Sequence, residues 1–243
     1  PRGMNLNVRV RRVSDNDYWR DFPRNPISQA ERLLASDASL AWTASPAWSF
    51  SARTLAWQTL QDPSSVIVPP YDRMPQLVGR WRERNLPGGF SAHVETDFTE
   101  FHSDRVLTGQ PNAQRSFVMA QLTHPWQAPG WFVIPRLQLH ARHYRFDAPL
   151  GSTGSTPGAG AEAAQVTVPT YSLSSGLVFE RDTRLFGRAL VQTLEPRAFY
   201  VYTPFRAQNH LPNYDSAATD FNFATIFSEN TFGGHDRIAD LAE

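Results

Sequence analysis

Apolar and polar residues alternate with a period of two along most of the chain. In residues 38–57 the alternation runs through two segments on either side of a Ser-Pro step, and a Trp lies close to each end of that step. This period is typical of a β-strand with two different faces, so the stretch predicts a β-hairpin. No helical period of 3.6 residues competes with it. Nine segments show the pattern: Leu6–Arg12, Leu34–Thr43, Trp48–Gln58, Pro75–Arg82, Phe90–Glu100, Ser116–Thr123, Trp131–Tyr144, Tyr171–Glu180 and Leu194–Tyr202.

Charged residues stay on one face of the predicted strands, except at strand ends. In the first hairpin, Leu40 and Phe50 belong to the apolar face, and Val94 lies on the same face of a later strand. Asp37 and Arg53 belong to the polar face. A soluble β-sandwich separates its two faces in the same way, so the alternation alone does not decide what covers the apolar face.

The connections between predicted strands alternate in length. The short connections are 44–47, 83–89 and 124–130, and the long ones are 13–33, 59–74, 101–115, 145–170 and 203 onward. A link of middling length at 181–193 fits less well. An up-and-down barrel in a membrane gives this alternation, because every second connection lies on the same side, and outer-membrane barrels have short turns on the periplasmic side. A Greek-key sandwich has no reason to sort its loops by length.

Tryptophans gather at the short connections, which is the third indication of a membrane. Five of the seven lie there: Trp42, Trp48, Trp81, Trp126 and Trp131. Amphipathic rings collect at the interface between a bilayer and water. We therefore predict an all-β fold, an antiparallel up-and-down transmembrane β-barrel, of which the chain supplies a part of about 9–11 strands.

The composition limits the remaining possibilities. The 23 basic and 23 acidic residues balance, so the charge gives no signal for a nucleic-acid partner, and the absence of Cys leaves no disulfide framework. We predict that residues 1–243 form part of one barrel domain. Within it, 145–170 would be a flexible external loop rich in small residues, and 203–243 a long loop region with a further strand. We also expect the chain to be an interior piece of a longer protein.

Catalytic and metal-binding patterns are weak. Glu95 and Asp97 lie on the same face of one predicted strand, as a glycosidase pair would, but a charged wall of the lumen explains them better. His140 and His143 are three residues apart on a strand and so point to opposite faces, which argues against a shared metal. The sequence has no nucleophile elbow and no phosphate-binding Gly loop. We predict no enzymatic activity, no cofactor and no metal.

Three stretches carry a resemblance to a known family. They are "RRVSDNDYWRDF" at 11–22, "FERDTRLFGRALVQTLEPRAFYVY" at 179–202 and "NYDSAATDFNFATIFSENTFGGHDRI" at 213–238. Together they resemble the LptD family of outer-membrane lipopolysaccharide-assembly proteins, also called organic solvent tolerance proteins. The likeness covers most of the chain in the right order and is poorest at 145–170.

The resemblance implies a function and a set of partners. The barrel would insert lipopolysaccharide (LPS) into the outer leaflet of the Gram-negative outer membrane, as the barrel component of the LPS export machinery. A lipoprotein plug like LptE would sit inside it, and an N-terminal domain outside this chain would contact the periplasmic proteins of the LPS bridge. The chain would supply interior strands, without the seam strands through which the substrate leaves.

Nine residues are candidates for contacts with the lumen or the plug. Within the family blocks, Glu195 and Arg197 share a strand face, whereas Tyr214, Asp215, Asp236 and Arg237 are expected to fix a loop that folds over or into the lumen. A purely structural ion network is an equal explanation for the first pair. The full set is Arg53, Glu95, Asp97, Glu195, Arg197, Tyr214, Asp215, Asp236 and Arg237.

Three alternative functions stay open at this point. The chain could belong to another outer-membrane barrel, such as a porin or a receptor. It could be a soluble β-sandwich of a carbohydrate-active protein, in which case the face of Leu40, Phe50 and Val94 would be a protein core. It could also be a structural piece of a barrel with no transport role of its own.

Overall fold

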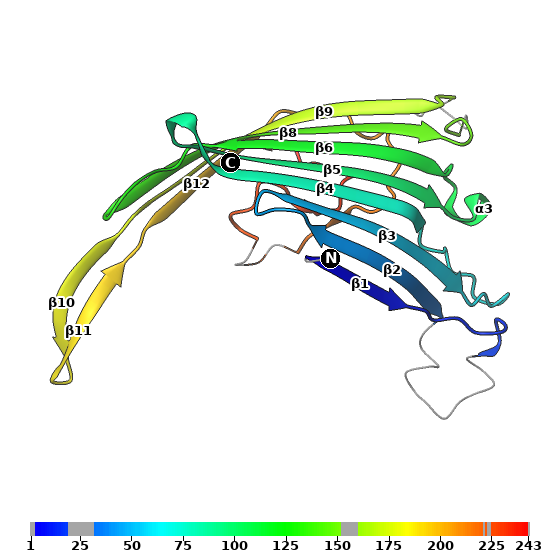
Figure 1. Cartoon of the computed structure of the whole chain (residues 1–243), viewed down its shortest axis with the longest axis horizontal. Helices are drawn as coiled ribbons and strands as arrows, with labels where there is room; N and C mark the ends of the chain where they lie inside the picture. The colour runs from blue at the N-terminus through cyan, green and yellow to red at the C-terminus, as the bar shows by residue number, and fades with distance from the viewer. Residues whose placement is uncertain (1–2, 19–31, 152–159, 221, 223–224, 243) are drawn as a thin grey trace.

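One large curved antiparallel sheet dominates the computed structural model, which describes residues 3–18, 32–151, 160–220, 222 and 225–242 (Figure 1). The strands of this sheet follow the order β1-β2-β3-β4-β5-β6-β8-β9-β12-β15, with β7 paired to β8. Their bounds are β1 Met4–Arg9, β2 Leu33–Thr43, β3 Trp48–Thr59, β4 Asp72–Leu86, β5 Phe90–His102, β6 Ala113–Thr123, β7 Trp126–Ala128, β8 Trp131–Phe146, β9 Ala163–Leu177, β12 Arg197–Thr203 and β15 Leu241–Ala242.

Neighbouring strands of the large sheet are close in sequence and antiparallel, which is an up-and-down order. Within the described residues, the end strands β1 and β15 are not paired with each other, so the sheet stays open. The predicted fold class, a part of an antiparallel up-and-down barrel, is confirmed. Among the described residues, no helix has the length and apolar composition to cross a membrane.

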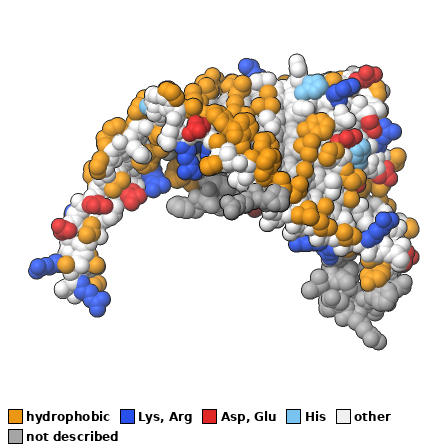
Figure 2. All heavy atoms as spheres, in the orientation of Figure 1, with side chains coloured by type: hydrophobic (Ala, Val, Ile, Leu, Met, Phe, Trp, Pro, Cys, Tyr) orange, Lys and Arg blue, Asp and Glu red, His pale blue; other side chains and the backbone are white. Residues whose placement is uncertain are grey.

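The convex outer face of the sheet is apolar and exposed. Leu40, Phe50 and Leu139 have 40%, 39% and 45% of their surface exposed, although each lies in a strand that is paired on both sides. In Figure 2, apolar side chains gather over the middle of the strands, and charged side chains gather at the end near α3 (Arg105–Thr108) and along β10 and β11. The sandwich alternative requires a second layer of protein over this face. No second layer of the described residues covers it.

Several strands extend further than the alternation predicts. β9 begins at Ala163 and pairs with β8 as far as Arg145, so the connection between them is 147–162 and not the predicted 145–170. The small residues of 163–170 carry little hydrophobic signal, and pairing with a neighbouring strand decides their conformation. Residues 152–159, where the predicted flexible loop is centred, lie outside the described residues. At the other end of the chain, β1 is Met4–Arg9, earlier than the predicted Leu6–Arg12.

A hairpin that the sequence pattern did not predict projects from one end of the sheet. β10 (Phe179–Leu185) and β11 (Arg188–Leu194) continue the register of β9 and β12, because Gly176 pairs with Arg197 and Phe179 pairs with Leu194. At the usual rise per strand residue, the hairpin extends about 25 Å beyond the level at which β8 begins. In Figure 1 it stands away from the other strands. Both strands mix charged and apolar residues, which hid the period.

The described residues of 204–240, named here the inner segment, lie behind the sheet in the view of Figure 1 and against its concave inner face. The segment contains the short hairpin of β13 (Ala217–Ala218) and β14 (Phe232–Gly233). After it, the chain returns to the large sheet, where β15 pairs with the end of β12. The main buried cluster lies between the inner segment and β5, β6 and β8, and comprises Phe101, Ala113, Tyr144, Leu211 and Tyr214.

Candidate functional site

Arg115 is the centre of the contacts between the inner segment and the sheet. It lies on the inner face of β6 and is fully buried. Its Nη1 donates to Oδ1 of Asp236 at 2.7 Å, and its Nη2 donates to Oδ2 of Asp215 at 2.7 Å. A guanidinium in the low-dielectric interior needs such charge partners, because an unpaired buried charge costs several kcal/mol. The inner segment supplies both of these hydrogen-bonded carboxylates.

Asp236 has further hydrogen-bond partners besides Arg115. Its Oδ1 also accepts from the hydroxyl of Tyr144 at 2.6 Å, and its Oδ2 accepts from the backbone N–H groups of Tyr214 at 2.6 Å and Asp215 at 2.8 Å. The carboxylate therefore joins two strands of the sheet to the "NYDSA" turn. Hydrogen bonds to an ionised group are the stronger kind, so this side chain fixes the segment to the wall.

Two parts of the inner segment, residues 211–216 and 234–237, also hold each other. The hydroxyl of Ser216 accepts from the backbone N–H of Asp236 at 2.7 Å and of Arg237 at 3.1 Å. The guanidinium of Arg237 donates to the backbone oxygens of Leu211 at 2.7 Å and Pro212 at 3.1 Å. The segment is therefore a defined loop in which these buried polar groups hold each other, as a loop away from solvent requires.

Gly234 allows these two parts of the inner segment to come close. Its φ is +76°, a conformation that L side chains rarely adopt, and a Cβ on it would lie 2.3 Å from the backbone oxygen of Asp215. Its neighbour Gly233 has room, since the nearest atom to a Cβ there would be 3.9 Å away. Gly234 is the position at which only glycine fits.

Aromatic packing accompanies the ion cluster. The ring of Tyr214 stacks on that of Phe101 with centroids 4.7 Å apart, and Tyr71 meets it edge-on at 4.8 Å. The Tyr214 hydroxyl donates to the backbone oxygen of Pro111 at 3.0 Å. The guanidinium of Arg115 lies over the ring of Phe101, with its Cζ 4.9 Å from the ring centroid. Burial of these rings adds apolar stabilisation to the electrostatic contacts.

The surroundings shift the pKa values of the inner segment. Burial opposes ionisation of Asp215, but the hydrogen bond and charge of Arg115 outweigh it and hold the pKa of that carboxyl below its ordinary value. Burial raises the pKa of the Tyr214 hydroxyl. Burial, with the charge of Arg115, lowers the pKa of His235. The surroundings therefore favour an ionised Asp215 beside Arg115 and a neutral imidazole at His235.

Two predicted residues of β5 also contact this cluster. Asp97 is 2% exposed and has its Oδ1 3.5 Å from Nη2 of Arg115. Glu95 binds Nε of Arg80 at 2.6 Å and lies 3.3 Å from Nε2 of His235. The paired carboxylates of this strand thus belong to a network of ion pairs. They lie beside the inner segment.

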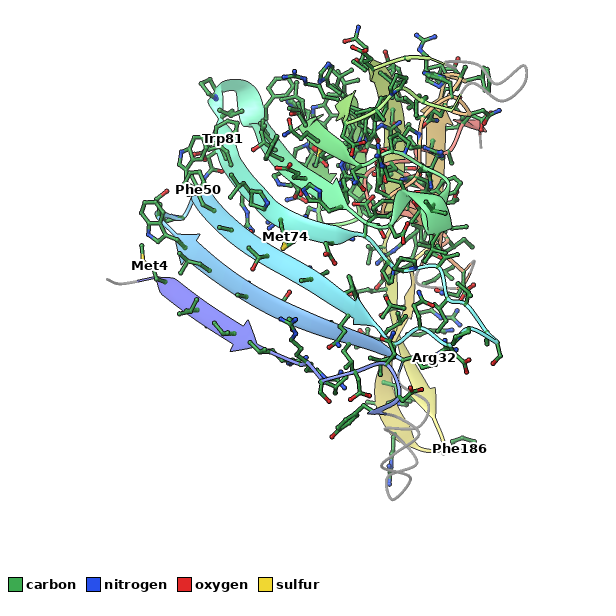
Figure 3. All side chains as sticks on the ribbon, turned by 90° about the vertical axis from the view of Figure 1, so that its right-hand side faces the viewer. Met4, Arg32, Phe50, Met74, Trp81 and Phe186 are labelled. Carbon is green, nitrogen blue, oxygen red and sulfur yellow. The ribbon has the colours of Figure 1, made fainter. Side chains whose placement is uncertain are left out.

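Three predicted residues lie outside the cluster. Arg53 pairs with Asp37 across β2 and β3, on the inner face. Glu195 and Arg197 pair with each other at 3.2 Å at the base of the projecting hairpin, and about half of each side chain is exposed. The nine predicted residues are therefore not one site. Six of them come together, and the other three stay apart; the six are Glu95, Asp97, Tyr214, Asp215, Asp236 and Arg237. Figure 3 shows the open side of the sheet, formed by β1 to β4.

The sequence pattern missed the two wall residues that matter most. Arg115 precedes the predicted start of its strand at Ser116, and Tyr144 was placed in a strand without a role. Arg142, which the alternation of residues does place on the polar face, also contacts the segment: its guanidinium donates to the backbone oxygen of His235 at 2.9 Å and to Gln208. An earlier strand start at Ala113 would have put Arg115 on the inner face, because it is two residues from Phe117 in the alternation.

Comparison with known proteins identifies the family. Residues 2–243 match the sequence model of LptD, described as LPS transport system D. The chain belongs to the LptD family. This LptD-family chain is 57% identical over 242 residues to the LPS-assembly protein LptD of Paracidovorax citrulli and 54% identical over 245 residues to that of Acidovorax sp. (strain JS42). It is 40% identical over 244 residues to that of Ralstonia nicotianae. In each case the match covers 98% of this chain and 29% of the relative's length.

Proposed function

We propose that this chain is part of the barrel that inserts LPS into the outer leaflet of the outer membrane. Membership of the LptD family carries the proposal, because relatives at 40% to 57% identity are named LPS-assembly protein. That name also favours LPS assembly over a porin or a receptor. Since the chain spans 29% of those relatives, the complete activity would need the rest of the protein.

The two faces of the sheet support a place in the bilayer. The exposed apolar outer face suits hydrocarbon, and backbone groups in hydrocarbon must be paired, as those of a barrel wall are. The inner face carries charges in pairs, such as Arg53 with Asp37 and Arg80 with Glu95. A wet lumen of mixed charge would accommodate the polar sugar and phosphate head of LPS, while its acyl chains stay in lipid.

The inner segment would act as a closure of the lumen. It connects strands at the end where the long connections lie, which the alternation of loop lengths makes the extracellular end. Its contacts through Arg115, Tyr144 and Asp236 would keep it against the wall while substrate passes elsewhere. A plug lipoprotein like LptE would meet this segment or the polar wall beside it. No covalent step is required, so the proposal includes no enzymatic role.

A complementation experiment tests the proposal. In a Gram-negative host depleted of its own LptD, the full-length protein that contains this chain is expected to restore delivery of newly made LPS to the cell surface. Surface LPS would be measured by labelling intact cells. A full-length protein that assembles in the outer membrane and restores porin-like permeability, but no LPS delivery, would contradict the proposal.

A further inference from the structure

The inner segment makes a second contact with the wall, far from Arg115. The carboxylate of Glu229 accepts a hydrogen bond from Nη1 of Arg136, which lies on β8. The same carboxylate oxygen, Oε1, accepts from the hydroxyl of Ser172 on β9 at 3.1 Å. Arg136 lies on the inner face, because it shares the alternation of β8 with Arg142, and Ser172 is its partner across the two strands. One side chain of the inner segment is therefore joined to two neighbouring strands.

An aromatic contact lies beside this ion pair. The ring of Phe227 meets the ring of Phe199 on β12 edge-on, with the centroids 6.0 Å apart. By alternation, Phe199 shares the inner face of β12 with Val201, which is buried. The contacts therefore reach β8, β9 and β12, which are neighbours in the sheet. We name residues 225–229 the tip, and the contacts made by Phe227 and Glu229 the lower anchor.

The lower anchor lies at the other end of the sheet from Arg115. Arg115 pairs with Tyr144, whereas Arg136 pairs with Thr123, so the two rows are eight positions apart on both strands. At the usual rise per strand residue this distance is about 26 Å along the wall. Thr123 ends β6, directly before a short connection. The inner segment thus enters at the end of the long connections and reaches down to the end of the short ones.

The lower anchor holds the tip separately from the rest of the inner segment. Asn230 follows Glu229 in the chain and has its own contacts with the docked part. Its side-chain amide donates to the backbone oxygen of Arg237 at 3.2 Å, and its Oδ1 accepts from the backbone N–H of Ala239 at 2.9 Å. The contacts with Arg115 come later in the chain. Loss of the contact at Glu229 should therefore release the tip and leave the rest of the segment docked.

The pair of Arg136 and Glu229 is partly shielded from water. The side chain of Arg136 is 32% exposed, and that of Glu229 is 18% exposed. A hydrogen bond between two ionised groups is stronger than a neutral one, and salt screens a partly buried pair less than an exposed one. Arg136 is therefore the wall residue that contributes most to the lower anchor.

We propose that Arg136 is a positioning residue that keeps the tip against the wall, so that the closure of the lumen extends to the end of the short connections and excludes dissolved solutes. The inference rests on the bilayer placement and on the closure made under the proposed function. Water hydrates a polar wall and a polar loop as well as they bind each other, so a loop held at one end only can swing away from such a wall. An anchor at each end of the wall removes that freedom.

Hydrogen exchange of the full-length protein in detergent tests the anchor. Arg136→Glu replaces the attraction to Glu229 by repulsion, and amide exchange at 225–229 is expected to rise at least about fivefold, the upper range of one partly exposed charge pair. Exchange at 234–237 should stay as in the wild type. Arg82→Glu makes the same charge change at an exposed position on the polar face of β4 and is the matched control. Combining Arg136→Glu with Glu229→Arg should restore protection of the tip.

Uptake of a large hydrophilic antibiotic tests the seal. Cells whose sole copy is the full-length Arg136→Glu protein are expected to take up vancomycin faster, in proportion to the fraction of released tip. Arg82→Glu and the double exchange should match the wild type. Surface LPS is measured in the same cells, because a membrane short of LPS also leaks. Heat-modifiable gel mobility identifies a variant that has not folded, and Glu229→Gln with Ser172→Ala then weakens the same contact without reversing a charge.

Each part of the inference has a result that would overturn it. Wild-type exchange at the tip of a folded Arg136→Glu protein, or equally fast exchange along the whole inner segment, would overturn the separate anchor. A double exchange that restores no protection would overturn the pairing of Arg136 with Glu229. A released tip with uptake as slow as in the wild type, or uptake that rises only where surface LPS falls, would overturn the seal.

The result can be separated from that of the proposed function. Failure of the wild-type protein to deliver LPS would contradict the proposed function, whereas exchange at the tip and its restoration by the double exchange would still report on the anchor. Normal LPS delivery by the wild type, together with wild-type exchange in Arg136→Glu, would overturn the anchor alone.

Discussion

Asp236 accepts a hydrogen bond from Nη1 of Arg115 at 2.7 Å, although the two residues are 121 positions apart in the chain. Both side chains are completely buried. This contact joins the inner segment to the wall of the sheet, and Asp215 and Tyr144 complete it. Arg115, a residue of β6, therefore holds the inner segment in position, and the alternation of residues does not predict the path of that segment.

Removing the cation is expected to release the inner segment. Arg115→Met leaves Asp215 and Asp236 buried without their charge partner, which typically costs about 3–5 kcal/mol when one side of a buried pair is lost. The change would be measured as a lower urea midpoint of the folded full-length protein and as new protease cleavage within 204–240. Arg197→Met, in an exposed pair, is the control, with an expected cost below about 1 kcal/mol. Equal effects of the two substitutions would refute the role of Arg115.

The two adjacent glycines should differ sharply. Gly234→Ala places a Cβ against the backbone of Asp215 at a φ of +76°, and the left-handed conformation alone costs about 1–2 kcal/mol for a residue with a Cβ. We expect the inner segment to exchange its amide hydrogens faster in this variant. Gly233→Ala has space for its methyl group and should exchange like the wild type. Similar exchange in the two variants would show that the close approach is not needed.

Acid should loosen the inner segment in two steps. His235 has a pKa below its ordinary 6.5, so an unfolded segment takes up a proton first, and stability falls as the pH drops below about 6.5. Asp215 has a pKa below its ordinary 3.8, so its contribution is complete above about pH 4 and is lost as the pH falls further. Hydrogen exchange of 204–240 from pH 8 to pH 3 would measure both.

Substitution separates the two titrations. His235→Gln should remove the change between pH 7 and pH 5 and leave the later one in place. Asp215→Asn should weaken docking at neutral pH and flatten the acid step. A segment whose protection rises as the pH falls from 8 to 5 would contradict the sign of the His235 shift.

Charge on the outer face should block assembly. Leu40→Arg places a guanidinium on the apolar belt, which costs about 2–4 kcal/mol near the middle of a bilayer. Asp37→Ala, three residues away on the inner face, removes only one partner of a partly exposed pair and should be mild. Heat-modifiable gel mobility and outer-membrane fractionation of the full-length protein are the measurements. If Asp37→Ala were the more harmful of the two, the apolar face would be a protein core.

Sequence alternation predicted the strands and their faces because it is a local property. A strand turns its side chains to opposite sides with a period of two, so Leu40 and Asp37 reveal their faces within one segment. The same reasoning missed the hairpin of β10 and β11, where Arg181, Asp182 and Val191 mix charge with apolar residues. It also missed the start of β9, where pairing with β8 overrides weak local preference.

The residues of the candidate site were also predicted only in part from the sequence. The family blocks pointed to Tyr214, Asp215, Asp236 and Arg237, but not to the wall residues that they contact. Only the tertiary structure brings Arg115 and Tyr144 to them and leaves Glu195 and Arg197 aside, because contacts between a loop and a distant strand depend on sheet curvature and on how the chain returns to it. The sequence by itself determined which face of each strand is apolar. The fold decided which buried charges meet across that curved wall.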